Sequence, residues 1–337
     1  MAESRALVTG ATGYIGPHLV AALVDGGWSV RATGRRVRPP RLPAAAEYLA
    51  VDLLADDLGP LLAGVTTVFH LAGASSSLSS VEEMQRVNVE GTTRLLAALP
   101  PAIDRFVHMS STSVYGEEAP LPLPVEERSA GEPSRSYGQA KWGAELAVWA
   151  AADRGLPAVV LRPVTVYGPG AIKLLASAAL DVAVERRLGR REVVLPRPTI
   201  EQRLVHLDDV VAASIHLAGS PAAVGRAFNV AGLYPTSDEV AAVLAEIHGL
   251  AVRALGPDEA EPPSDERRRG YEELVAAGMS SDILFTSERL RFLRKANLNN
   301  RLSSAALDAT GFRFTHTDLS SSVGATVDWY RAHRWLI

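Results

Sequence analysis

A tyrosine and a lysine stand four positions apart in Ser136–Lys141, at the start of a run with helical character. On a helix, positions i and i+4 lie on one face, so the phenol of Tyr137 and the ammonium of Lys141 can approach the same atom. A phenol titrates near about 10, and a neighbouring cation favours its ionised form. The pair could therefore move a proton at neutral pH. Amphipathic helices with an exposed lysine often show the same spacing, so its meaning depends on the rest of the chain.

A strand, a glycine turn and a helix are predicted at the start of the chain. Residues Arg5 to Thr9 read as a short buried strand, and apolar residues follow at helical spacing from His18. Glycines at such a junction let the backbone approach a pyrophosphate, which the amide groups of the helix N-terminus then bind. Pro17 fits the first helical turn, where no amide hydrogen is needed. The residues expected to contact a dinucleotide here are Gly10, Thr12, Gly13, Tyr14, Ile15 and Gly16.

The end of the second predicted strand, Trp28 to Thr33, bears on the choice of cofactor. An acidic side chain at this point holds the 2′-hydroxyl of NAD, whereas an arginine accommodates the 2′-phosphate of NADP. This chain has Arg35 and Arg36 directly after Gly34, which favours NADP over NAD, although solvated loop charges would give the same sequence. Asp52 and Leu53 are expected beside the adenine.

Small and polar residues follow the next predicted strands. The strand 106–109 leads into a serine-rich turn at 110–116, and hydroxyl groups at the carboxyl end of a parallel strand lie where open α/β sheets bind ligands. A polar loop or a helix cap would have a similar composition. The further residues expected to contact the cofactor are Leu71, Ala72, Gly73, Asn88, Tyr137, Lys141 and Pro163.

The composition excludes several kinds of protein. With 337 residues, 47% of them apolar and 21% charged, the chain can build a sizeable core. A net charge of −4 does not provide the basic face that nucleic acids require, and the absence of cysteine excludes disulfides and thiolate chemistry. His70, His108 and His206 lack metal-ligand spacing, so no metal site is expected. Without a signal-peptide pattern or a membrane-length apolar run, we expect a cytoplasmic protein with no membrane partner.

Taken together, the motifs resemble the extended short-chain dehydrogenase/reductase superfamily, in its NAD(P)-dependent epimerase/dehydratase branch. They recur in family order along nearly the whole chain. The segments that carry the resemblance are Thr9–Gly16, His70–Gly73, Asn88, Ser110–Gly116, Tyr137–Lys141, Leu161–Pro163, Val205–Val210, Thr310–Phe312 and Thr326–Arg331.

The resemblance implies an α/β fold, with a Rossmann-type doubly wound parallel sheet and a smaller C-terminal α/β substrate lobe. Residues 1–170 are expected to form the NAD(P)-binding domain, to which segments around 200–232 return, and residues 171–337 mainly the substrate lobe. Within that lobe, the charged and proline-rich stretch Gly256 to Arg269 is interpreted as a solvated loop or lid.

The resemblance also assigns roles. Tyr137 would be the proton donor and acceptor for a substrate oxygen, and Lys141 would lower the pKa of the phenol and hold the nicotinamide ribose. Ser111 would hydrogen-bond the same substrate oxygen, with Thr112 as a nearby substitute. One base and one hydroxyl would thus converge on the oxygen whose carbon exchanges a hydride.

Two departures from the family narrow the reaction. Sugar-nucleotide 4,6-dehydratases carry an Asp-Glu pair where this chain has Thr112 and Ser113, and decarboxylases of the branch carry a glutamate at the second position. Elimination of water and decarboxylation then lack an acid. The leading hypothesis is therefore a 4-epimerase or 4-ketoreductase acting on a nucleotide-activated sugar.

The sequence leaves more than one substrate class open. Arg203 stands one position after the place expected for a pyrophosphate-binding arginine, where Gln202 occurs instead. The alternative is an NADPH-dependent ketoreductase or dehydrogenase of a non-nucleotide natural-product intermediate. A catalytically silent NAD(P)-binding protein is disfavoured because the expected catalytic residues are intact. A homodimer through helices at 81–99 and 138–152 is expected. The candidate substrate contacts are Ser75, Ser111, Thr112, Arg203 and Arg301.

Overall fold

A computed structural model describes residues 5–75, 79–116, 127, 133–172, 174–195, 199, 201–256, 258–259, 264–280 and 301–337. The chain divides into two compact units, each made of three separate segments. The first unit comprises Met1–Val164, Asp208–Ala231 and Asn300–Arg313. The second comprises Thr165–Leu207, Gly232–Asn299 and Phe314–Ile337.

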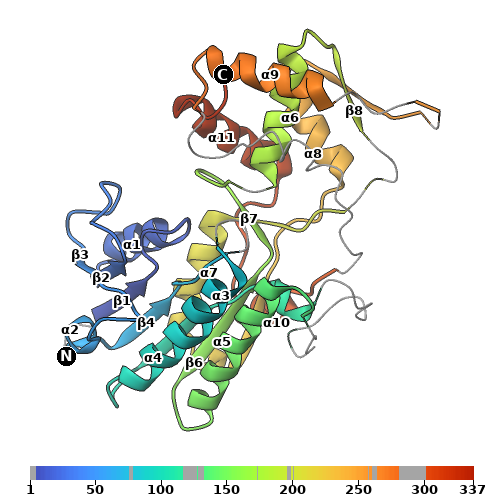
Figure 1. The fold of residues 1–337 in the computed structure, drawn as a ribbon. Helices are drawn as coiled ribbons and strands as arrows, with labels where there is room; N and C mark the ends of the chain where they lie inside the picture. The colour runs from blue at the N-terminus through green and yellow to red at the C-terminus, as the bar shows by residue number, and fades with distance from the viewer. Residues whose placement is uncertain are drawn as a thin grey trace. The chain divides into compact units, whose positions relative to one another are not determined.

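A seven-stranded sheet, parallel throughout, forms the centre of the first unit (Figure 1). The strand order is β10-β6-β5-β4-β1-β2-β3, so the chain winds outward in both directions from the boundary between β1 and β4. The predicted Rossmann-type sheet is confirmed. Its strands are β1 (Arg5–Thr9), β2 (Ser29–Gly34), β3 (Glu47–Ala50), β4 (Thr67–His70), β5 (Arg105–Met109), β6 (Ala158–Pro163) and β10 (Arg226–Val230).

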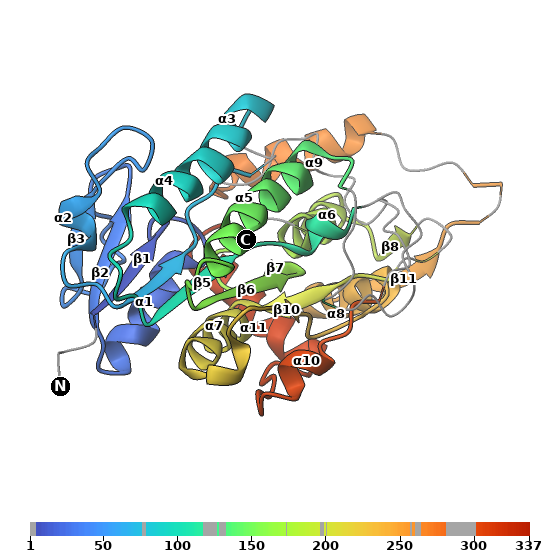
Figure 2. The ribbon, with the colours of Figure 1, turned by 90° about the horizontal axis from the view of Figure 1, so that it is seen from below.

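Helices cover both faces of this sheet. α4 and α5 lie on one face and α1 and α7 on the other (Figure 2). This two-sided cover explains why β4, β5 and β6 are buried at every position. The helices of the first unit are α1 (Gly16–Asp25), α2 (Gly59–Leu62), α3 (Val81–Gln85), α4 (Gly91–Ala98), α5 (Ser136–Ala152), α7 (Leu207–Gly219) and α10 (Ala305–Asp308), with 3₁₀ turns at Thr112–Tyr115 and Pro221–Ala223.

A π-helical turn, Arg86–Glu90, joins α3 to α4 in one helical run. Ser80 begins the run, since its side chain accepts a hydrogen bond from the amide of Glu83. The buried residue of the π turn is Asn88. Such turns often occur at functional sites, because they change which side chains face inward.

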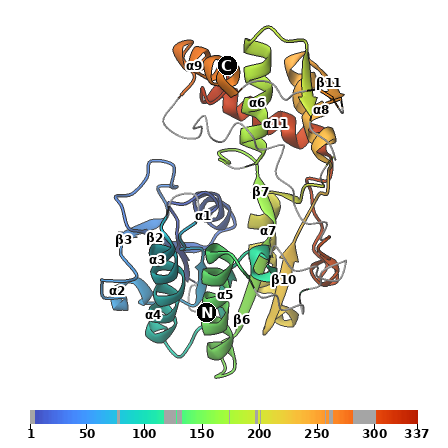
Figure 3. The same cartoon turned by 45° about the vertical axis from the view of Figure 1, so that its right-hand side comes forward.

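The second unit is built around α6 (Leu175–Arg187), which is buried from Leu175 to Glu185. It packs among α8 (Ser237–His248), α9 (Ser264–Ala276) and α11 (Leu319–Ala332), as Figure 3 shows. Two small parallel sheets accompany these helices. They pair β7 (Thr165–Tyr167) with β9 (Leu204–His206), and β8 (Glu192–Leu195) with β11 (Ala251–Ala254).

The loop predicted for Gly256 to Arg269 is wrong from residue 264 onward, because α9 begins at Ser264. Its first turn carries Asp265 and Glu266, whose charges suit the positive end of the helix dipole. Gly270 allows close packing on α6, since a β-carbon there would lie 2.9 Å from a methyl carbon of Val184. Residues 257 and 260–263 lie outside the described part of the chain.

None of the helices in the described part of the chain combines the length and the apolarity needed to cross a lipid bilayer.

Candidate active site

Ser111, Tyr137 and Lys141 all belong to the first unit. Ser111 follows β5 and begins the 3₁₀ turn, where its hydroxyl oxygen accepts a hydrogen bond from the amide of Ser113 at 3.2 Å. Tyr137 and Lys141 lie one turn apart on α5. The Ser111 hydroxyl donates to the Ser113 hydroxyl at 3.2 Å, and it lies close enough to the Tyr137 phenol to lower the pKa of that phenol. The fold thus brings together a serine and a tyrosine that are 26 positions apart in the sequence.

The side chain of Tyr137, like that of Val87, packs against an apolar cluster formed by Ala74, Met84 and Ala140. Burial raises the pKa of the Tyr137 phenol above 10.0, and the nearby Ser111 hydroxyl opposes that rise. The expected effect of Lys141 on the pKa of the phenol stays a prediction.

Lys141 is buried beside the end of β5. Its amine donates a hydrogen bond to the carbonyl oxygen of Met109 at 2.9 Å. A β-carbon at Gly73 would lie 3.2 Å from the Lys141 amine and 3.0 Å from the Asn88 side-chain oxygen, so glycine is what leaves this corner open. The pKa of His70 falls to about 3, mainly through burial and secondly through the charge of Lys141.

Asn88 uses its side-chain amide to hold the backbone that follows Gly73. It accepts a hydrogen bond from the Ala74 amide at 2.7 Å and donates one to the Ala74 carbonyl at 3.1 Å. Ser75 is the next residue along this segment and is half-buried. Asn88 therefore shapes the candidate site from the π turn.

The glycine turn packs closely against the end of β4. Gly10 has a φ of +67°, and a β-carbon there would lie 2.6 Å from the amide nitrogen of Ala72. A β-carbon at Gly16 would collide with the carbonyl of Gly10. The Ala72 amide also donates to the hydroxyl oxygen of Thr9 at 3.2 Å. Only glycine fits at these two positions, and the result is a bare backbone turn at the N-terminus of α1.

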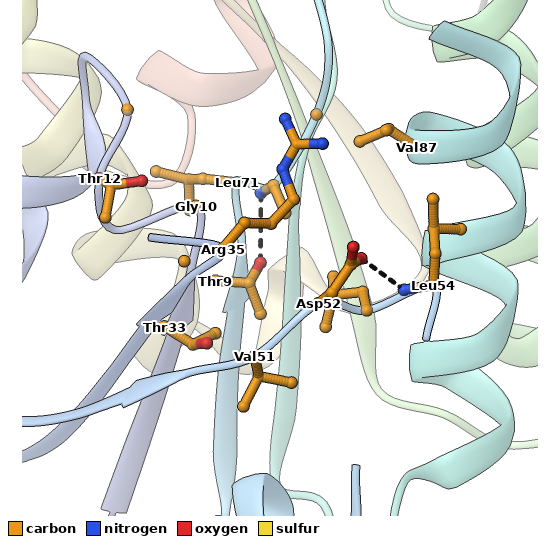
Figure 4. Close-up of a pocket in the computed structure, with 15 residues that line it drawn as sticks. Thr9, Gly10, Thr12, Thr33, Arg35, Val51, Asp52, Leu54, Leu71 and Val87 are labelled. Carbon is orange, nitrogen blue, oxygen red and sulfur yellow. Dashed lines mark hydrogen bonds between the residues drawn. The ribbon is translucent and has the colours of Figure 1, made fainter. Parts of the chain in front are cut away.

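A cavity of about 160 Å³ opens beside this turn (Figure 4). Arg35 and Asp52 both project side chains into it. Nine residues that the sequence proposed for cofactor binding line the cavity: Gly10, Thr12, Gly13, Arg35, Asp52, Leu53, Leu71, Ala72 and Gly73. Six further lining residues were missing from that proposal: Thr9, Thr33, Gly34, Val51, Leu54 and Val87.

The other proposed cofactor and catalytic residues do not line this cavity, and their roles stay predictions. The proposed cofactor contacts outside it are Tyr14, Ile15, Gly16, Arg36, Asn88, Tyr137, Lys141 and Pro163. The hydroxyl of Thr112 lies 3.4 Å from the Pro163 carbonyl, to which it donates.

The two arginines after β2 differ in their surroundings. The Arg35 guanidinium lines the cavity and lies 3.6 Å from the carboxylate of Glu83. The carbonyl of Arg36 accepts a hydrogen bond from the phenol of Tyr48 at 2.5 Å. Of the pair, Arg35 is therefore the one placed to meet a group bound in the cavity.

Arg41 is a contact that the sequence did not reveal. Its guanidinium donates hydrogen bonds to the carbonyl oxygens of Thr12 and Gly13, each at 2.8 Å. The segment between β2 and β3 is thereby tied to the glycine turn. In the sequence, Arg41 is one of several arginines in a basic run, and nothing distinguishes it from Arg38.

The candidate diphosphate ligands belong to different units. Arg203 is half-buried just before β9 in the second unit, and Arg301 is exposed before α10 in the first. Their proposed role stays a prediction.

Residues 6–231 match the model of the NAD dependent epimerase/dehydratase family. The chain belongs to this family. It is thus an enzyme of the epimerase or reductase type, and NAD or NADP is the cofactor typical of the family. The family recognised from the sequence motifs is confirmed.

Similar proteins include both epimerases and reductases. The UDP-glucose 4-epimerase of Mycolicibacterium smegmatis is 29% identical over 351 residues, covering 97% of this chain and 98% of its own. The dihydroflavonol 4-reductase of Zea mays is 33% identical over 251 residues, covering 66% of this chain and 69% of its own. The solved structure of MoeE5 in complex with UDP-glucose and NAD is 28% identical, covers 98% of this chain and 99% of its own, and has a TM-score of 0.71.

Proposed function

We propose that this enzyme oxidises or reduces a single carbinol or ketone carbon of a nucleotide-activated sugar, as a 4-epimerase or a 4-ketoreductase. The observation that carries the proposal is that the fold brings the Ser111 hydroxyl near the Tyr137 phenol at the end of β5, where the amine of Lys141 is buried. Two hydroxyl groups can then meet one substrate oxygen.

The residues present fit a nicotinamide dinucleotide. Gly10 and Gly73 leave backbone and space where a β-carbon would intrude, and both line the cavity. When bound, such a cofactor accepts or supplies the hydride at the substrate carbon. Tyr137 takes or returns the proton on the attached oxygen, while the Ser111 hydroxyl stabilises the charge that develops there.

The surroundings of Ser111 favour oxidoreduction without elimination. Thr112 and Ser113 follow it, and neither can act as the carboxylic acid that loss of water or of carbon dioxide requires. The site therefore governs one carbon–oxygen centre.

A sugar nucleotide is the favoured substrate because of the relatives. The mycobacterial epimerase aligns over nearly the whole chain, and MoeE5 binds UDP-glucose together with NAD. For the cofactor we favour NADP, because Arg35 lines the cavity at the end of β2, where NAD-binding proteins carry an acidic side chain.

Two observations favour a second candidate, an NADPH-dependent ketoreductase of a non-nucleotide natural-product intermediate. Gln202 stands where a pyrophosphate-binding arginine is expected, and the maize relative is named a dihydroflavonol 4-reductase. Loss of that arginine would remove a charge-assisted contact to a diphosphate.

Nucleotide handling by the purified protein tests the proposal. Retained nucleotide that is reduced on addition of UDP-glucose, with an epimer as the final product, supports the epimerase. Net consumption of NADPH with a UDP-4-ketosugar supports the reductase. Turnover of a non-nucleotide ketone without reaction of either sugar nucleotide supports the second candidate and contradicts the first.

We also propose a homodimer through the helical run 81–98 and α5. Leu146 on α5 and Val81 on α3 are both 50% exposed. A two-fold partner would cover such side chains. Sedimentation of the protein and of Leu146→Glu tests this, since the variant should sediment as a monomer.

A further inference from the structure

A buried polar network lies directly behind the segment that carries Ser111. At its centre, Glu145 on α5 is fully buried and Arg162 on β6 is 4% exposed. Arg162 donates to both carboxylate oxygens of Glu145, at 3.0 and 2.6 Å, which makes a bidentate ion pair. The proposed reaction uses neither side chain.

Two successive turns of α5 bind two successive residues at the end of β5. The amine of Lys141 donates to the carbonyl of Met109 at 2.9 Å. One turn further along α5, Glu145 accepts a short hydrogen bond from the hydroxyl of Ser110. Met109 and Ser110 directly precede Ser111 in the sequence. These two contacts therefore fix the position of Ser111 relative to α5, the helix that carries Tyr137.

Arg162 extends the network to the chain that follows Ser111. A single guanidinium nitrogen donates to the phenol of Tyr115 and to the carbonyl of Glu127, each at 2.9 Å. Tyr115 in turn donates to the side-chain oxygen of Asn229 on β10 at 2.8 Å. The residues on both sides of Ser111 are therefore tied to the same ion pair.

Stability alone does not account for this arrangement. Taking both charges out of water carries a large penalty, and apolar residues of similar volume often replace a buried ion pair without loss of stability. An apolar pair, however, could not bind the Ser110 hydroxyl or the Tyr115 phenol.

We propose that Glu145 and Arg162 are positioning residues that hold the Ser111 hydroxyl in register with the Tyr137 phenol. This inference rests on the proposed roles of Ser111 and Tyr137. It concerns how their geometry is kept, and it does not depend on the identity of the substrate.

The test reports on the Ser111–Tyr137 contact without requiring turnover. A fluorotyrosine is introduced at position 137 of the whole chain, and its ¹⁹F resonance is recorded. Ser111→Ala defines the resonance position of a phenol without its partner. In Glu145→Leu/Arg162→Met, where neither charge is left unpaired, the resonance should move by at least half of that displacement or split into several lines.

Two further variants keep the test decisive. Ser110→Ala removes only the hydroxyl that binds Glu145, and it should move the resonance in the same direction even if the double variant does not fold. Arg105→Met is the matched control, because Arg105 lies at the other end of β5 and donates to the Ala218 carbonyl at 2.9 Å. It should lower the melting temperature without moving the resonance.

An unmoved resonance in Ser110→Ala, or in a folded double variant, overturns the positioning role. An equal displacement in Arg105→Met overturns it as well, since any loss of packing would then have the same effect. The proposed function fails separately, if Tyr137→Phe retains full turnover.

Discussion

A buried glutamate binds arginine in each of the two units. The two glutamate–arginine sites differ in the other groups that they contact. In the first unit, Glu145 and Arg162 also bind hydroxyl groups on both sides of Ser111. In the second, Glu185 on α6 binds Arg190 at 2.5 Å and lies 3.3 Å from Arg267 on α9. The contact between Glu185 and Arg267 joins α6 to α9, and none of the proposed site residues takes part in either contact. A buried charge therefore indicates a functional role only through the groups that it holds in place.

Among changes that affect one unit only, Tyr137→Phe in the first unit is expected to have the largest effect, which is on turnover. Removal of the phenol hydroxyl deletes the proposed proton donor, and turnover should fall by roughly 100- to 10,000-fold. Melting temperature and nucleotide affinity should stay close to the parent values, since the ring still packs on its apolar cluster. Steady-state kinetics with calorimetric measurement of nucleotide binding checks this. Unchanged turnover would place the chemistry elsewhere.

A change in the second unit should show the opposite pattern. Glu185→Gln removes the carboxylate that faces Arg267 and one of the two that bind Arg190, which keeps Glu266 at 2.6 Å. Breaking such a buried pair costs about 3 kcal/mol of unfolding free energy. Nucleotide affinity should not change, because the cavity is lined by residues of the first unit. Urea denaturation measures the first quantity and fluorescence titration of NADPH the second. A loss of nucleotide affinity without a loss of stability would contradict the comparison.

Arg35→Ser tests the cofactor preference within the first unit. Hydrogen bonds to charged groups contribute about 1.5–3 kcal/mol, so affinity for NADP should fall about 10- to 100-fold. Affinity for NAD should be nearly unchanged. Arg36→Ser serves as the matched control, because Arg36 does not line the cavity. Equal losses for the two nucleotides would remove the argument for NADP.

The smallest effect is expected at the start of α8 in the second unit. Thr236 and Glu239 form a capping box, and Thr236→Ala should cost about 1 kcal/mol of unfolding free energy. Hydrogen bonds from the amide and hydroxyl of Thr236 lower the pKa of Glu239 below 4.5. A lowered pKa in the folded state means that this stabilisation is present above pH 4.5 and disappears as the pH falls through the folded value. Thermal melts of the parent and of Glu239→Gln should therefore converge in acid. A difference that persists there would contradict this account.

A structural feature can be predicted from the sequence when the residues that determine it are close together along the chain. The glycine turn is encoded within a few consecutive residues, so its place before α1 follows from the pattern. The Glu145–Arg162 network could not be predicted, because its members come from α5, β5, β6 and β10 and meet only in the folded sheet. Arg41 was missed for the same reason.

The error at α9 has a related cause. A stretch dense in charge lacks an apolar stripe wide enough to predict a helix, and its burial depends on contacts that α6 supplies. Leu274 is buried against that helix, while most of the charged side chains near it stay at the surface. Propensity along the chain cannot show a partner that is distant in the sequence.

The π turn between α3 and α4 gives up helical regularity for the placement of two side chains. Deleting one residue from Arg86–Glu90 would let the run close into an ordinary α-helix with a full ladder of hydrogen bonds. It would also rotate one half of the run by about 100° relative to the other half. The hydrogen bond between Asn88 and Ala74 and the hydrogen bond between Thr92 and His70 could then no longer form at the same time. A shorter, more regular helix would thus gain local stability at the expense of one of these contacts. Engineering for thermostability should therefore leave the extra residue in place.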